Sequence, residues 1–253
     1  MRNRITLKKS IKIINDEYVI KKKKDNIINT YNYLKSRAFD YFPEVLKEEE
    51  DTIYTKYIPD VDEPKEQKII DLINVITLLH SKTTMYKEID IDNYKYIYEE
   101  VNKEIDDILN YYNIVMDNIE LAVYPSPSNY LIERNISFIY SAIRYAKRSI
   151  NYWYKLIENK RKVRVVTVHN NLSLDHYLEF DFTELLDIYL NKYPLQKEEL
   201  LLFLTIISIP KKITSSNSEY KNVLTIRRQL DYIYKTSEIV KKYNLKDNIE
   251  LVE

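Results

Sequence analysis

The sequence predicts an α+β protein, with a small antiparallel sheet near its N-terminus and a larger, mainly helical part after it. Two observations carry this prediction. Apolar and polar residues alternate on both sides of a polar turn within residues 11–24, which is typical of a β-hairpin. Beyond Pro59, apolar residues recur every three or four positions instead, which is the period of an amphipathic helix. We therefore expect a β-rich domain with one helix over residues 1–60 and a mainly helical domain over residues 61–253.

The first domain should hold a hairpin, one helix and two further strands. Ile11–Ile14 and Tyr18–Lys21 flank the polar turn of the hairpin. Asp25–Phe39 carries apolar residues at helical spacing, and its N-terminal Asp suits the helix dipole. Two apolar runs, residues 44–46 and 52–58, then predict strands on either side of an acidic turn.

The second domain should begin with a helix after Pro64, a residue that suits a first helical turn. Two long helices should follow, and the short proline-containing break between them, residues 122–128, implies an antiparallel pair. Ser126 before Pro127 predicts the start of the second long helix, and Trp153 should anchor the core. The apolar stripes that mark these three helices are Ile69, Leu72, Ile73, Ile76 and Leu79; Tyr94, Ile97, Tyr98, Val101, Ile105, Ile108, Tyr112 and Val115; and Ile132, Ile136, Ile139, Ile143, Ala146, Ile150, Trp153 and Leu156.

The C-terminal third should consist of one strand and three helices. Val163–Val168 is a β-branched run that predicts a short strand. Helices are expected over residues 182–190 and 196–209, with Asp181 as the N-cap of the first. A last helix should follow residues 215–218 and place one apolar face in the core. That face comprises Val223, Ile226, Leu230, Ile233 and Tyr234.

Composition excludes several classes of site. The 253 residues include no cysteine and no glycine, so disulfides, thiolate chemistry and glycine-rich phosphate loops are excluded. Asn and Asp should then occupy the left-handed backbone positions. The formal net charge of +0 gives no reason to expect nucleic acid or an anionic membrane surface as a partner. We expect a cytoplasmic protein, because the lysine-rich N-terminus lacks an apolar signal core.

The stretch after the predicted strand holds two of the three histidines, His169 and His176. A polar bend of Asn, Ser and Asp residues carries them, and it ends in an apolar pair, Tyr177-Leu178. This stretch resembles the catalytic loop of the protein-kinase-like superfamily, in its aminoglycoside-phosphotransferase and spore-coat kinase-like branch. That branch has a pattern close to His-Gly-Asp-Leu-His-Pro-Gly-Asn-Ile-Leu, against which His169, Leu172 and the closing apolar pair match.

The resemblance implies a small antiparallel-sheet lobe, a larger helical lobe, and ATP with Mg²⁺ as cofactors. Asn171 stands where the catalytic Asp would be, and His176 stands where the metal-binding Asn would be. Asp175 is the remaining carboxylate of the loop. Lys21, at the end of Val19-Ile20-Lys21, is similar to the phosphate-pairing Lys of active kinases. The alternative for Lys21 is a solvated strand end.

The chain departs from the family in two further places. The helix that would supply a Glu to the phosphate-pairing Lys contains none. We expect Lys21 therefore to be largely exposed or paired with a residue from elsewhere. The metal-binding Asp that follows the loop in related kinases is also missing, since Asp181-Phe182 lies too close to Asn171 and begins a helix. Compared with the family, several tens of residues are absent after Leu178. Residues 79–83 are similar to the Leu-His-x-x-Thr pattern that closes the corresponding helix in spore-coat kinase-like proteins, and its His80 is expected to be a hydrogen-bonded packing residue.

Three functions remain open from the sequence. The first is a pseudokinase-like protein that binds or scaffolds a small molecule or a protein partner without phosphotransfer. The second is an active small-molecule phosphotransferase with displaced catalytic residues, Asp175 among them. The third is a helical interaction protein. A metal-hydrolase site using His169, Asp175 and His176 is a further interpretation, although the sequence has no second cluster of possible ligands.

Overall fold

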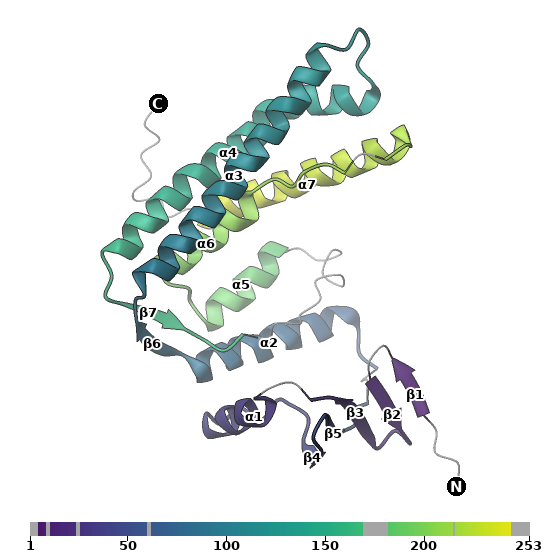
Figure 1. The fold of residues 1–253 in the computed structure, drawn as a ribbon, viewed down its shortest axis with the longest axis vertical. Coiled ribbons are helices and arrows are strands. Elements are labelled where there is room, and N and C mark those ends of the chain that lie inside the picture. The colour runs from purple at the N-terminus through teal and green to yellow at the C-terminus, as the bar shows by residue number, and fades with distance from the viewer. Residues whose placement is uncertain are drawn as a thin grey trace. The chain divides into compact units, whose positions relative to one another are not determined.

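The computed structural model describes residues 5–8, 11–23, 26–59, 62–168, 182–214 and 216–243 (Figure 1). It confirms the α+β class, with a small antiparallel sheet followed by a mostly helical remainder. Contacts between residues divide the chain into two compact units. The first unit comprises Met1–Lys87 and Arg164–Pro194, and the second comprises Glu88–Val163 and Leu195–Glu253. No described helix is both long and apolar enough to cross a membrane.

The first unit contains a five-stranded antiparallel sheet. Its strands are β1 (Ile5–Lys8), β2 (Ile11–Ile14), β3 (Tyr18–Lys22), β4 (Val45–Glu48) and β5 (Thr52–Lys56), in the order β1-β2-β3-β5-β4. The predicted hairpin is confirmed, because β2 and β3 pair antiparallel around the turn at residues 15–17. Asn15 and Asp16 have φ values of 52° and 56° in this turn, and Asn26 has 61°. Asn and Asp therefore do occupy left-handed positions, although Ala38 does so as well, with φ 54°.

Two helices of the first unit pack together through a small apolar core. Helix α1 (Ile27–Ser36) lies between β3 and β4 in the chain, and α2 (Lys65–Thr83) follows β5 directly after Pro64. Leu34 of α1, Phe39 just after it and Leu79 of α2 form the buried cluster. The partly buried side chains against that cluster are Tyr31, Tyr33, Phe42, Val75 and Leu78.

A second, two-stranded sheet pairs β6 (Met85–Glu88) with β7 (Lys162–Val165). Strand β7 confirms the first part of the strand expected over residues 163–168, which ends at Val165 instead of Val168. Strand β6 was not expected from the sequence. Helix α5 (Phe182–Lys192) completes the first unit and packs on α2.

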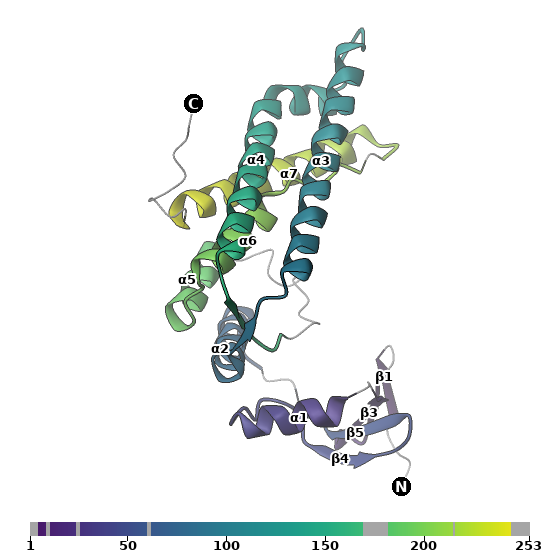
Figure 2. The ribbon, with the colours of Figure 1, turned by 60° about the vertical axis from the view of Figure 1, so that its left-hand side comes forward.

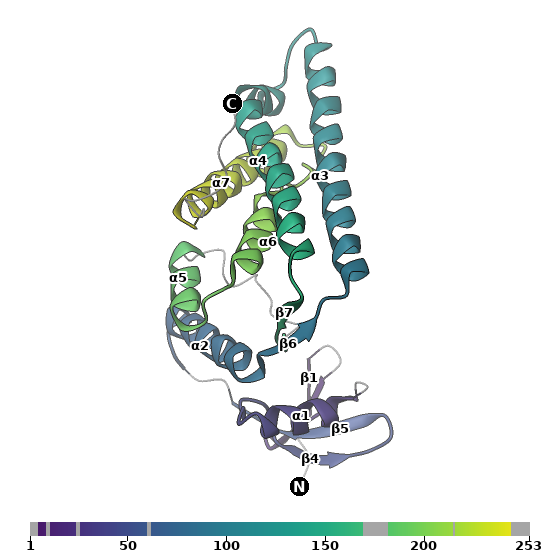
Figure 3. The ribbon, with the colours of Figure 1, turned by 90° about the vertical axis from the view of Figure 1, so that its left-hand side faces the viewer.

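The second unit is a helical bundle, seen from two further sides in Figures 2 and 3. Helices α3 (Ile91–Glu120) and α4 (Pro127–Glu158) form the predicted antiparallel pair. Hydrogen bonds join Tyr98 to Asn151 near one end of the pair and Asn113 to Tyr140 near the other, as the antiparallel direction requires. The Ser126 hydroxyl accepts from the Asn129 amide, so the predicted helix start is confirmed.

Helices α6 (Lys197–Ser208) and α7 (Glu219–Tyr243) pack against α4. Trp153 is 1% exposed, which confirms it as a core anchor. Ile226 and Ile233 of α7 are buried as expected. Tyr234 is 58% exposed, so its assignment to the core face was wrong. That face continues through Thr236 and Ile239, three and six positions after Ile233, which follows the helical period.

Candidate functional site

Lys21 lies on the third strand of the five-stranded sheet. Its backbone pairs with Ile53 of β5, and that of Val19 pairs with Thr55. Residues directly opposite each other in a ladder share one face of the sheet. Ile53 is 0% and Thr55 is 1% exposed, so Lys21 belongs to the buried face of the sheet. The side chain is half-buried rather than largely exposed.

The helix that follows Lys21 in the chain offers it no carboxylate. The ten residues of α1 include neither Asp nor Glu, and its first turn is entirely uncharged. The single cation of α1 is Lys35, in its last turn, where the helix dipole favours positive charge. Any carboxylate beside Lys21 would therefore have to come from outside α1.

The segment between β7 and α5 begins from a fixed point on α2. Thr83 of α2 is 0% exposed, and its hydroxyl donates to the Leu79 carbonyl at 2.7 Å. The same hydroxyl oxygen accepts a hydrogen bond from the Thr167 amide at 3.0 Å. Thr167 is therefore held two residues before His169, where the sequence leaves the described part of the chain.

Beyond that segment, the chain is attached to α2 through Tyr189 of α5 and Tyr193, which directly follows α5. His80 Nδ1 and the Tyr189 hydroxyl are hydrogen-bonded at 2.7 Å, and the Thr84 and Tyr193 hydroxyls at 2.8 Å. The His80 ring contacts both tyrosine rings edge-on, with centroids 5.8 Å apart in each case. His80 is half-buried, which confirms it as a hydrogen-bonded packing residue.

Arg164 of β7 contacts the chain that directly follows α5. Its guanidinium lies 4.3 Å from the centroid of the Tyr193 ring, within cation–π range. Its Nη2 also donates to the Pro194 carbonyl at 2.9 Å. We call the set of His80, Thr83, Thr84, Arg164, Thr167, Tyr189 and Tyr193 the loop frame. The loop frame thus holds Thr167, before positions 169–181, and Tyr189 and Tyr193, after them, against the C-terminal end of α2.

Most of the predicted site residues lie outside the described part of the chain. His169, Asn171, Asp175 and His176 all fall within residues 169–181, as does the proposed N-cap Asp181. Their roles stay predictions. Among the residues that the structure does describe, no three His, Asp or Glu side chains are grouped so that they could hold a metal ion.

The sequence did not single out Tyr189 and Tyr193. They are four residues apart, with Tyr189 in α5 and Tyr193 directly after it, and the Tyr193 amide donates to the Tyr189 carbonyl at 2.8 Å. Their four-residue spacing shortly after the loop is the signal that could have identified them. With 25 tyrosines in the chain, that spacing does not set this pair apart from the others. Comparison with known proteins adds no assignment, because no protein-family model and no curated protein sequence matches this chain.

Proposed function

We propose that this chain is a degenerate kinase-like protein, similar to the aminoglycoside-phosphotransferase and spore-coat kinase-like branch. In this proposal it binds a small molecule or a protein partner and does not transfer phosphate. On this proposal the chain keeps the small sheet lobe of the family and the loop frame, whereas the groups that would carry out phosphotransfer are replaced.

The observation that carries the proposal is the position of Lys21 in the order of elements. In protein kinases the phosphate-pairing Lys lies on the third strand, and the helix that comes next supplies its Glu partner. Here Lys21 lies on β3 and faces the buried side of the sheet, and α1 comes next along the chain. Helix α1 has no carboxylate. This combination supports an inherited small lobe that has lost one part of its nucleotide-binding apparatus.

The loop sequence supports the loss of phosphotransfer. Phosphoryl transfer needs metal ions that neutralise the charge developing on the transferred group. Asn171 cannot accept a proton as a carboxylate does, and imidazole at His176 is a poor ligand for Mg²⁺, which prefers oxygen. Lys21 would suit a phosphate oxygen, but α1 offers it no Glu. The residues therefore fit a phosphate group better than they fit a metal–nucleotide complex.

A thermal-shift experiment with ATP tests the proposal. The melting temperature of the chain is measured with ATP alone and with ATP plus Mg²⁺, for the wild type and for Lys21→Ala. Lys12→Ala is the matched control, because Lys12 pairs with Ile20 and so lies on the opposite face of the same sheet. We expect Mg²⁺ to add nothing to any stabilisation by ATP, since Asn171 and His176 stand where related kinases have the catalytic Asp and the metal-binding Asn.

One outcome would overturn the proposal in favour of an active phosphotransferase. This is a Mg²⁺-dependent stabilisation that Lys21→Ala abolishes and Lys12→Ala retains. That result would show a working metal–nucleotide site, and Asp175 would then be its first candidate ligand.

A further inference from the structure

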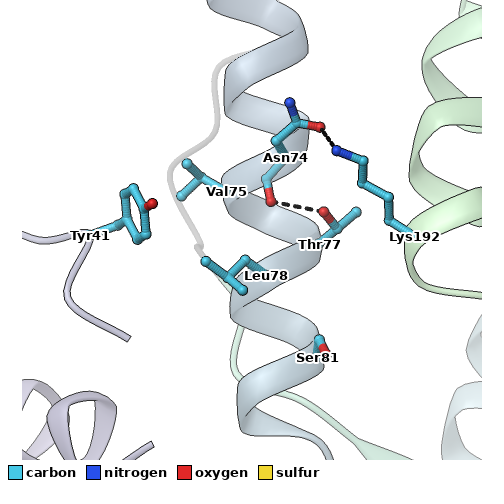
Figure 4. Close-up of a pocket in the computed structure, with 7 residues that line it drawn as sticks. All are labelled: Tyr41, Asn74, Val75, Thr77, Leu78, Ser81 and Lys192. Atoms are coloured by element: carbon cyan, nitrogen blue, oxygen red, sulfur yellow. Dashed lines mark hydrogen bonds between the residues drawn. The ribbon is translucent and has the colours of Figure 1, made fainter. Parts of the chain in front are cut away.

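A pocket of about 320 Å³ lies on α2, and none of its lining residues belongs to the loop frame (Figure 4). Its volume falls at the lower end of the range for small-molecule sites, about 300–1,000 Å³. Helix α2 contributes most of its lining, Lys192 of α5 adds a cation, and Tyr41 from the chain after α1 adds an aromatic ring. Lys21 is not among the described residues that line it.

One side of the pocket is polar. Asn74, Thr77 and Ser81 lie on the side of α2 that faces Lys192 (Figure 4). The Lys192 ammonium donates to the Asn74 side-chain oxygen at 2.6 Å, so a neutral group holds this cation. The Thr77 hydroxyl donates to the Asn74 carbonyl at 2.8 Å. Among the residues that the structure describes, no acceptor is found for the Asn74 amide nitrogen or the Ser81 hydroxyl, which leaves both as donors for a ligand.

The other side of the pocket is apolar. Val75 and Leu78 point from α2 toward Tyr41 (Figure 4), and both pack against the buried cluster of Leu34, Phe39 and Leu79. This wall is therefore backed by the core of the first unit. Tyr41 is 65% exposed, although a large aromatic side chain gains by burial. A ligand ring placed between Tyr41 and the two aliphatic side chains would cover it.

We infer that this pocket binds a small aromatic acid, whose acidic group is either a phosphate or a carboxylate. The anionic group would lie at Lys192, where it could accept charge-assisted hydrogen bonds from the ammonium and further ones from Asn74 and Ser81. The aromatic part would lie against Val75, Leu78 and Tyr41. The inference does not depend on the proposed function, because none of the residues that carry it belongs to the kinase-like loop or to β3.

Titration of the full chain with phenyl phosphate, and separately with benzoate, tests the inference. Binding is followed through the methyl NMR signals of Val75 and Leu78, which report on the pocket itself. We expect saturable shifts with a Kd of about 1 mM or tighter for at least one acid, and the better acid identifies the anionic group. Inorganic phosphate should bind more weakly than phenyl phosphate, because it leaves Tyr41 and the apolar wall uncovered.

Two variants separate the charge from its surroundings. Lys192→Gln should weaken binding about tenfold, as expected for the loss of a hydrogen bond to a charged group. Lys82→Gln is the matched control, because it removes one positive charge from α2 at an exposed position outside the pocket lining, and it should bind like the wild type. Lys21→Ala should also bind like the wild type, so that failure here is distinguishable from failure of the kinase-like proposal.

Two results would overturn the inference. The first is the absence of saturable shifts at Val75 and Leu78 with both acids. The second is equal affinity of the wild type and Lys192→Gln for an acid that does bind. Equal weakening by Lys192→Gln and Lys82→Gln would also overturn the inference, since it would show a general effect of charge and not a specific site.

Discussion

The bond between Thr83 and Thr167 offers a direct test of the loop frame. Thr83→Val keeps the shape of the side chain and removes its hydroxyl, so the Thr167 amide loses its acceptor. A buried donor without an acceptor costs about 1–3 kcal/mol. Thr167 is half-buried, and water can reach it in part, so we expect a value near the lower end, about 1–1.5 kcal/mol.

The substitution also removes the bond from the Thr83 hydroxyl to the Leu79 carbonyl, and a control must account for this. Thr225 in α7 makes the same kind of bond, to the Lys221 carbonyl at 2.9 Å, at an exposed site. Thr225→Val should change the free energy of unfolding by no more than about 0.5 kcal/mol, as surface substitutions usually do. Thr83→Ser keeps the acceptor for Thr167 and serves as the conservative variant.

Native-state hydrogen exchange at the Thr167 amide is the appropriate assay, because it reports the opening of this one bond. We expect exchange about tenfold faster in Thr83→Val, since 1.4 kcal/mol corresponds to a factor of ten. Thr83→Ser should exchange close to the wild-type rate. Equal exchange rates in the Val and Ser variants would refute the argument, because the acceptor would then play no part in holding the chain before His169.

Two further predictions concern the helical unit. Burial raises the pKa of Tyr112, whose hydroxyl donates to the Lys211 carbonyl. Because the neutral phenol is favoured in the folded state, this shift leaves stability unaffected below the pKa of tyrosine in the unfolded chain, about 10. Stability is then lost as the pH rises from that value toward the higher pKa of the folded state. Urea unfolding should therefore show a loss of stability above about pH 10 that is smaller in Tyr112→Phe; equal losses in both would contradict this. Lys160→Met should destabilise the unit by about 2 kcal/mol, because it leaves the buried Glu198 carboxylate without its ion pair. This is less than for a fully buried pair, because solvent partly screens the lysine. Adding Glu198→Gln should recover most of that loss, and a double variant no more stable than Lys160→Met would count against the pairing.

The elements that the sequence predicted are those specified by neighbouring residues. The β2–β3 hairpin depends on alternation around one turn, and α3 and α4 depend on helical stripes and a local cap at Ser126. Strand β6 was missed because its four residues, Met85–Glu88, are too few to show a period. Its partner β7 comes only after α3 and α4, so nothing local to β6 indicates the pairing.

The candidate site was predictable to a smaller extent. Lys21 could be placed on a strand, but its face follows from the ladder that pairs it with Ile53, which the sequence does not specify. Tyr234 illustrates the same difficulty on a helix: tyrosine has an apolar ring and a polar tip, so it suits an exposed position as well as a core one. The loop frame depends on contacts of α2 with β7 and α5, and such contacts between distant segments follow from packing and not from any short motif.

The central proposal is that the chain is a degenerate kinase-like protein that does not transfer phosphate, and a turnover measurement tests it most directly. Purified protein is incubated with ATP and Mg²⁺, and then with Mn²⁺, with and without hydroxyl acceptors such as aminoglycosides. Release of ADP and phosphorylation of the acceptor are both measured, and Asp175→Ala and Lys21→Ala are tested in parallel. The proposal predicts that the wild type is no more active than either variant, because in the proposed resemblance Asn171 and His176 stand in place of the groups that phosphoryl transfer requires. Turnover in the wild type that disappears in Asp175→Ala and Lys21→Ala would contradict it and identify a rearranged, active phosphotransferase.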